Sequence, residues 1–166
     1  MLAKLADHHR GILEVVRRET LPDADVFHII LHRTSAMSLG PPPELMEYAS
    51  HEVAFRFPAL YPSVPIEAFL ARPVFHPNVH PENGFVCLWD RFSSGDTIVE
   101  AIRRLQRVIT WELWNDRTEH IMQPGAPEWH ERFATGLSCD RINLPAELQV
   151  VTLPQPRTRR SRLSLF

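Results

Sequence analysis

The segment from Arg72 to Asp90 constrains the fold more than any other part of this 166-residue chain. It holds four residues that interrupt regular structure: Pro73, Pro77, Pro81 and Gly84. Proline lacks a backbone donor and clashes with the preceding helical turn, so no long helix can pass through this segment. We therefore predict an irregular, rigid loop, with other secondary structure before and after it.

The residues before this loop have the patterns of one helix followed by strands. Five apolar residues predict an amphipathic N-terminal helix that ends before Leu21-Pro22: Leu2, Leu5, Ile12, Leu13 and Val16. Residues 26–31, 51–57 and 66–70 are rich in β-branched and large apolar side chains and predict three strands. Glycine and prolines at 40–43 predict a turn between the first two strands. Together these strands predict a small antiparallel meander.

The residues after the loop predict helices. Asp96 or Ser94 can cap a helix whose apolar residues keep the helical spacing: Ile98, Ala101, Ile102, Leu105, Val108 and Ile109. A shorter helix is expected from Pro127 to Gly136. The element order indicates an α+β fold with helices packed on one side of the sheet. We expect residues 1–153 to form one domain and residues 154–166, basic and punctuated by proline, to form a flexible tail.

Composition excludes several classes of function. With 44% hydrophobic residues the chain can build a core, and its net charge of −2 gives no bulk attraction to nucleic acid or to an anionic membrane. Charged residues interrupt the apolar N-terminus at Lys4, Asp7 and Arg10, so neither a signal peptide nor a membrane anchor fits, and we expect a cytoplasmic protein. Cys87 and Cys139 are too few for a disulfide scaffold, which predicts two free thiols.

The proline-rich loop also contains the residues that most clearly suggest a reaction. Cys87 lies nine residues after Asn78, the last residue of the tripeptide His76-Pro77-Asn78. A thiolate is a strong nucleophile and its thioester still reacts with amines, so Cys87 is a candidate carrier of an acyl group. The Asn78 amide can donate to an oxyanion without ionising, but it cannot act as a base.

These motifs resemble the ubiquitin-conjugating enzyme (E2) family over roughly residues 2–129. The likeness rests on the N-terminal helix, the Tyr61-Pro62-x-x-Pro65 turn, the His-Pro-Asn tripeptide, the Gly84-x-x-Cys87-Leu88 run and the helix that follows. It implies the E2 (UBC) fold and no metal or organic cofactor. It also implies three protein partners: an activating enzyme (E1) docked on the N-terminal helix, a ubiquitin-like protein held as a thioester, and a target protein that supplies a lysine.

The same resemblance implies a role for each matched residue. Cys87 would accept the acyl group and pass it to an amine, in an acyltransferase reaction. Asn78 would stabilise the oxyanion or brace the loop, while His76 and Pro77 would shape that loop. Asp116 occupies a stretch where family members often carry a residue that orients or deprotonates the incoming lysine. Asp90 and His80 are alternatives near the thiol that match no family position.

Three departures from the family pattern suggest a divergent, bacterial member. The gap between Asn78 and Cys87 is one residue longer than is typical, Ile66 replaces the second proline of the turn, and Trp89 follows the Cys-Leu pair. By family-level analogy such a member would act in antiviral defence beside its own E1 and ubiquitin-like protein. Neither the target nor a need for a ligase (E3) can be read from these residues.

Other functions compete with this interpretation. A non-catalytic binding module of the E2-variant or RWD type would have a similar fold, although such modules typically lack the tripeptide or the cysteine. A cysteine hydrolase would need a histidine beside the thiol, and no protease signature surrounds Cys87. A zinc site would use His76, His80 and Cys87, but no fourth ligand is evident.

Overall fold

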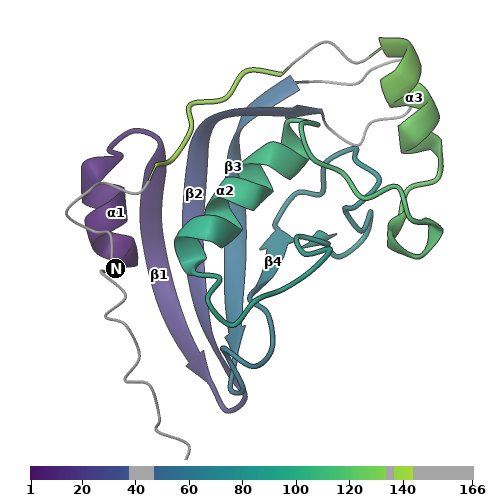
Figure 1. The fold of residues 1–166 in the computed structure, drawn as a ribbon. Coiled ribbons are helices and arrows are strands. Elements are labelled where there is room, and N and C mark those ends of the chain that lie inside the picture. The colour runs from purple at the N-terminus through teal and green to yellow at the C-terminus, as the bar shows by residue number, and fades with distance from the viewer. Residues whose placement is uncertain (38–46, 134–136, 144–166) are drawn as a thin grey trace, which may run out of the picture.

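The computed structural model describes residues 1–37, 47–133 and 137–143, which form an antiparallel sheet with helices around it (Figure 1). The five strands follow one another across the sheet in chain order: β1 (Leu13–Leu21), β2 (Ala24–Met37), β3 (Glu47–Pro58), β4 (Glu67–Leu70) and β5 (Phe85–Val86). The helices are α1 (Leu2–His8), α2 (Ile98–Ile109), the 3₁₀ turn η1 (Thr118–His120) and α3 (Gly125–Phe133). The predicted α+β class and antiparallel meander are confirmed, and the arrangement is compatible with the expected E2-like fold.

The N-terminal helix is much shorter than predicted. It ends at His8, and β1 begins at Leu13. Gly11 between them has a φ of +79°, which is incompatible with a right-handed helix, so the helix cannot continue through this residue. Leu2 and Leu5 are buried beneath the helix as expected, whereas Leu13 is buried in a strand and pairs with Leu31 of β2. The prediction of a helix reaching Leu21 was therefore wrong.

Strands β2 and β3 form the centre of the sheet and are longer than the sequence indicated. They pair over most of their length, with Ile29 opposite Val53 and Phe27 opposite Phe55. Ile29, Val53 and Phe55 are fully buried, so this register supplies one face of the core. The turn predicted at 40–43 and the tail 154–166 lie outside the described residues.

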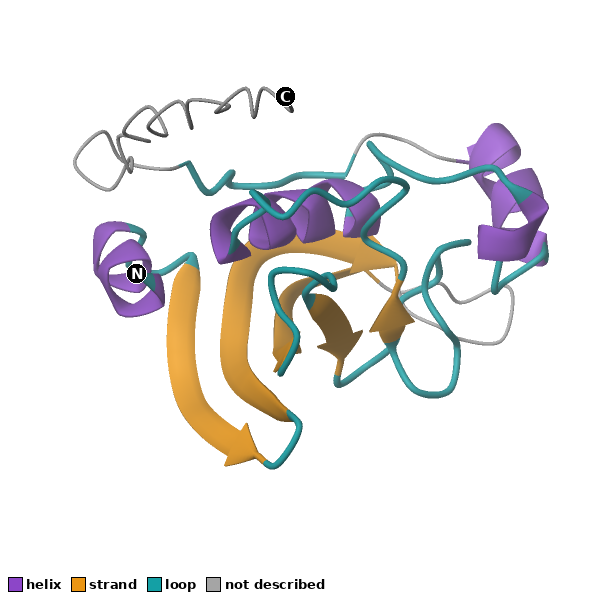
Figure 2. Ribbon diagram, turned by 60° about the horizontal axis from the view of Figure 1, so that its bottom comes forward, coloured by secondary structure: helices purple, strands orange, loops and turns teal. Residues whose placement is uncertain are grey.

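Helix α2 lies over one face of the curved sheet (Figure 2). All six apolar residues of its predicted face are buried. Its N-cap is Thr97, however, and not Asp96 or Ser94. The Asp96 carboxylate instead accepts a hydrogen bond from the Ser93 N–H at 2.8 Å, closing the turn before the helix. The Tyr61 hydroxyl donates to the Asp96 carbonyl at 2.9 Å, which attaches the tyrosine-proline turn to the start of α2.

The last helix begins slightly earlier than predicted. Helix α3 starts at Gly125, two residues before Pro127, and Gly136 at its expected end lies outside the described residues. No helix in the described part of the chain has both the length and the apolar character to cross a membrane.

Candidate active site

The loop that contains Cys87 folds back on itself as a narrow antiparallel turn. β5 pairs with β4, and Val86 also bridges to Val79 on the other arm of the loop. The Cys87 N–H donates to the Asn78 carbonyl at 2.9 Å. The two residues that were paired from the sequence therefore lie opposite each other, although nine positions separate them.

The Asn78 side chain is 1% exposed and all its polar atoms have partners. Its Nδ2 donates to the carbonyls of Asn115 and His120, both at 3.0 Å, and its Oδ1 accepts from the Asn115 N–H at 2.6 Å. Since both amide hydrogens are used, this geometry is that of a brace between the Cys87 loop and residues 115–120. A role as oxyanion donor would require Asn78 to exchange one of these partners.

His76 and Pro77 complete this attachment. The His76 ring is fully buried, its Nδ1 accepts a hydrogen bond from the Asn78 N–H at 3.1 Å, and its centroid lies 4.6 Å from that of Trp111. The Pro77 carbonyl accepts from the Met122 N–H at 2.7 Å. Both residues therefore lie inside the protein and attach the loop to it.

Burial makes His76 a source of acid sensitivity. Desolvation, with the nearby His130 as a second cause, lowers the pKa of His76 to about 3. In the unfolded chain this histidine binds a proton near pH 6.5. A pH below that value therefore stabilises the unfolded chain relative to the folded one. We expect the free energy of unfolding to fall by up to about 1.4 kcal/mol per pH unit below pH 6 through this group.

Urea unfolding of the wild type and of His76→Asn at pH 7.5 and pH 5 checks this prediction. The asparagine amide oxygen can replace Nδ1 as the acceptor for the Asn78 N–H, but the side chain cannot be protonated in this pH range. The variant should lose less stability between the two pH values than the wild type. Burial also lowers the pKa of His51, so some acid sensitivity should persist in both proteins. Equal losses would contradict the assignment to His76.

Cys87 is half-buried, and its thiol contacts a histidine that was not predicted as part of the site. The Sγ atom lies 3.1 Å from Nδ1 of His120, at the end of η1. Desolvation raises the pKa of the Cys87 thiol; the Trp89 backbone lowers it to a smaller extent, and the Asp90 charge raises it further. The thiol therefore favours its protonated form and hydrogen-bonds to the imidazole. No local motif marks His120, because it follows Cys87 by 33 residues and reaches it through the Asn78 contacts.

A hollow of about 320 Å³ opens beside the thiol. Four charged residues line it: Asp90, Arg104, Asp116 and Arg117. Asp116 is exposed there. Asp90 forms an ion pair with Arg117 at 3.5 Å and accepts from the Asn115 side chain at 3.3 Å. The structure thus brings Asp116 and Asp90 to the same hollow as Cys87.

The zinc alternative gains no support. Nδ1 of His80 lies within hydrogen-bonding distance of the Glu82 and Asn83 N–H groups, at 3.3 and 3.4 Å, so it stabilises its own turn. Within the described ranges, no three His, Cys, Asp or Glu side chains are grouped so that they could hold a metal ion. His76, His80 and Cys87 thus do not form a ligand set.

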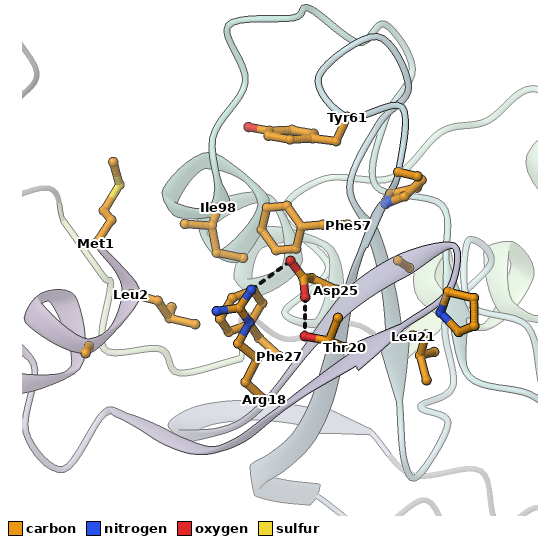
Figure 3. Close-up of a pocket in the computed structure, with 15 residues that line it drawn as sticks. Met1, Leu2, Arg18, Thr20, Leu21, Asp25, Phe27, Phe57, Tyr61 and Ile98 are labelled. Atoms are coloured by element: carbon orange, nitrogen blue, oxygen red, sulfur yellow. Dashed lines mark hydrogen bonds and ion pairs between the residues drawn. The ribbon is translucent and has the colours of Figure 1, made fainter.

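A second hollow, of about 790 Å³, lies against α1 and shares no lining residue with the first (Figure 3). Its polar groups are paired: Asp25 accepts from Arg18 at 2.9 Å and from Thr20 at 2.8 Å. Its lining includes the apolar side chains of Leu2, Leu21, Phe27, Phe57 and Ile98. It is therefore largely an apolar groove between α1, the β1–β2 hairpin and the start of α2.

Comparison with known proteins shows a partial likeness. No protein-family model matches the chain. Over 77 residues the chain is 32% identical to Protein PEROXIN-4 from Arabidopsis thaliana. The matched stretch is 44% of this chain and 49% of that protein, so the chain spans about half the length of this relative.

Proposed function

We propose that the protein is an E2-like conjugating enzyme for ubiquitin or a ubiquitin-like protein. In this proposal Cys87 accepts the C-terminal acyl group of that protein from an E1 as a thioester and transfers it to a lysine of a target. The observation that carries the proposal is the pairing of Cys87 with Asn78 across a His-Pro-Asn loop next to an antiparallel meander. The likeness to Protein PEROXIN-4, a ubiquitin-conjugating enzyme, supports the same family.

The site has the features that acyl transfer through a thiol needs. Cys87 is half-buried at the edge of a hollow, so a flexible C-terminal peptide and a lysine can both approach it. Partial burial also shields the thioester from water, which favours aminolysis over hydrolysis. The braced loop keeps the sulfur fixed relative to the hollow, and this limits the loss of entropy on reaching the transition state.

The partners follow from the proposed reaction. We propose that the E1 docks on α1, where the apolar groove between α1 and the β1–β2 hairpin offers a contact surface next to the helix. A bacterial antiviral pathway in the cytoplasm is the proposed setting, by analogy with divergent members of the family. This setting is independent of the chemistry at Cys87.

Asp116 is proposed to orient or deprotonate the incoming lysine. Its position on the hollow beside Cys87 suits an acceptor that arrives after charging. We expect Asp116→Ala to leave charging unchanged and to slow discharge to free lysine by about tenfold to a hundredfold. Single-turnover discharge of the preformed thioester measures this effect. An equal loss in both steps would indicate a general disturbance of the site.

Thioester hydrolysis is a second candidate, favoured by one specific observation. His120 lies beside the thiol, and a histidine in that place is what a cysteine hydrolase requires. The two candidates differ in the acceptor: a conjugating enzyme gives an amide with lysine, whereas a hydrolase gives a free carboxylate.

A single-turnover charging assay tests the proposed function. The wild-type chain, ubiquitin or a candidate ubiquitin-like protein, its E1 and ATP are mixed and separated on a non-reducing gel. We expect an adduct that dithiothreitol removes and that free lysine discharges as an amide. No adduct, despite demonstrated binding to the charged E1, would favour the non-catalytic E2-variant or RWD-like module.

A further inference from the structure

The Cys87 thiol needs a base, and the described residues place one beside it. Burial raises the pKa of this thiol, so attack on a thioester requires removal of its proton as the bond forms. Nδ1 of His120 lies 3.1 Å from Sγ, a distance at which the S–H group can donate to a neutral imidazole. A proton can therefore pass between the two side chains without a mediating water.

The position of His120 is set by its backbone. Its carbonyl accepts from Asn78 Nδ2 at 3.0 Å, and its N–H donates to the Arg117 carbonyl at 2.9 Å. Two residues later, the Met122 N–H donates to Pro77 at 2.7 Å. The His-Pro-Asn loop therefore holds the segment that carries the imidazole, and replacing the ring itself leaves these hydrogen bonds intact.

We propose that His120 accepts and returns the proton at Cys87 during acyl transfer, and that Asn78 is the positioning residue that keeps it there. The proposal rests on the acyl-carrier function proposed above and adds a residue to it. It gives the buried Asn78 amide a function in this chain that does not require a direct contact with the reacting acyl group.

Each step of the transfer balances with one proton on His120. In charging, His120 takes the thiol proton as Cys87 attacks the donor thioester, and returns it to the leaving thiolate. The new bond joins Cys87 Sγ to the acyl carbon, and the bond to the donor sulfur breaks. In discharge, the amine attacks that carbon, His120 takes a proton from the resulting ammonium, and Cys87 leaves with that proton as a thiol. No oxidant, metal or further reactant is consumed.

Both steps need the His120 imidazole as the proton acceptor. The charged groups that share the hollow with Cys87 are Asp90, Arg104, Asp116 and Arg117. Asp90 pairs with Arg117, and Glu119 precedes His120 on η1, where it is exposed. A variant of a neighbouring carboxylate is therefore the control for the His120 variants.

The test uses the full chain carrying Cys139→Ser, in which Cys87 is the remaining thiol. The acyl donor is N-acetyl-Gly-Gly thioester of mercaptoethanesulfonate, which needs no E1, and free lysine is the acceptor. Intact mass spectrometry follows formation and loss of the adduct between pH 6 and pH 9. We expect His120→Gln to slow both steps by about a hundredfold or more at each pH.

Matched variants separate proton transfer from structure. Glutamine at position 120 can still accept a hydrogen bond from the thiol but cannot take its proton. Glu119→Ala removes a neighbouring carboxylate from the same turn and should react like the parent chain, with the same pH dependence. Added imidazole should restore part of the rate in His120→Ala. Circular dichroism and thermal unfolding of each variant identify any that do not fold.

A double-mutant cycle tests the positioning role of Asn78. If Asn78 acts through His120, then Asn78→Ala slows transfer, and adding His120→Gln slows it little further. If the rate loss of the double variant equals the product of the two single losses, the two residues act independently, and this part of the proposal is overturned. Unaltered hydrogen exchange at Asn115 and His120 in Asn78→Ala would overturn it as well.

The outcomes distinguish this inference from the function on which it rests. Parent-like rates in His120→Gln would overturn the proton-transfer role and leave Cys87 as a carrier. Absence of any adduct in the parent chain, both with this donor and in the charging assay with E1 and ATP, would overturn both. If the adduct reacts only with water to give a free carboxylate, and this reaction still needs His120, the proton-transfer role is supported and the proposed function becomes hydrolysis instead of conjugation.

Discussion

Replacing Cys87 with serine is expected to remove the adduct that dithiothreitol can cleave. A serine hydroxyl is much less acidic than a thiol, so charging should slow by roughly a thousandfold or more. Any adduct that accumulates would be an oxyester, which dithiothreitol does not reduce or exchange. Cys87→Ala should form no adduct at this site. The measurement is the single-turnover charging assay with E1 and ATP, run with and without dithiothreitol on the wild type and both variants.

Cys139 provides the matched control for this prediction. It is also a half-buried free thiol, its pKa is raised by desolvation, and its Sγ lies 3.6 Å from the Thr34 hydroxyl. We expect Cys139→Ser to charge at the wild-type rate, because the described structure places no imidazole against this sulfur. A thiol-sensitive adduct that persists in Cys87→Ala and disappears in Cys139→Ser would move the nucleophile to the other cysteine.

The sequence predicted β2, β3, β4 and α2 from their apolar patterns, but it missed β1, which was predicted as helix, and the two-residue β5, which lies in the segment predicted as an irregular loop. The apolar residues of α2 repeat with the helical period from Ile98 to Ile109. They form one face of the helix, and that face is buried against the sheet. The prediction for the N-terminus was wrong because the pattern there is short. Leu13 and Val16 continue a helical spacing begun by Leu2 and Leu5, but the helix ends at His8, and the positive φ of Gly11 prevents it from resuming before β1 begins at Leu13. A single backbone conformation there outweighs a short periodic pattern.

The candidate site was predictable only where its parts are close in sequence. Asn78 and Cys87 face each other because their loop closes over a few residues, and prolines and Gly84 make that closure visible in the sequence. His120 was not predictable, because three hydrogen bonds of a buried amide bring its segment to the loop from about 40 positions away. Neither hydrophobic periodicity nor turn chemistry encodes such a contact.

Gly84→Ala should destabilise the protein more than a glycine substitution in an open turn would. Gly84 has a φ of +71°, and a Cβ atom there would lie 1.9 Å from the carbonyl oxygen of Leu70. The obstacle is backbone, and the same two residues are joined by a hydrogen bond from the Leu70 N–H to the Gly84 carbonyl at 2.9 Å. We expect a loss of about 3 kcal/mol or more in the free energy of unfolding, measured by urea denaturation.

Two other glycines separate the causes of this loss. Gly11 also has a positive φ, of +79°, but its added Cβ would meet only the far end of the Arg33 side chain at 3.9 Å. Gly11→Ala should therefore cost about 1 to 2 kcal/mol, from backbone strain alone. Gly95→Ala adds ordinary contact at 3.7 Å from a serine hydroxyl and should change stability by about 0.5 kcal/mol or less. Equal losses at positions 84 and 11 would mean that the loop relaxes away from Leu70 at little cost.

Gly84→Ala should also impair charging beyond what its stability loss explains. Residue 84 precedes β5, whose pairs Phe85 with Phe69 and Val86 with Ala68 fix the approach of the chain to Cys87. If the alanine pushes this strand away from Leu70, the sulfur moves relative to His120, and a shift of about 1 Å can cost about a hundredfold in rate. Gly11 is distant from the loop in the sequence, so the charging rate of Gly11→Ala should be proportional to its folded fraction. Charging rates measured at temperatures well below the unfolding midpoint of each variant distinguish the two. Equal charging rates in Gly84→Ala and Gly11→Ala would mean that the loop positions Cys87 without help from β5.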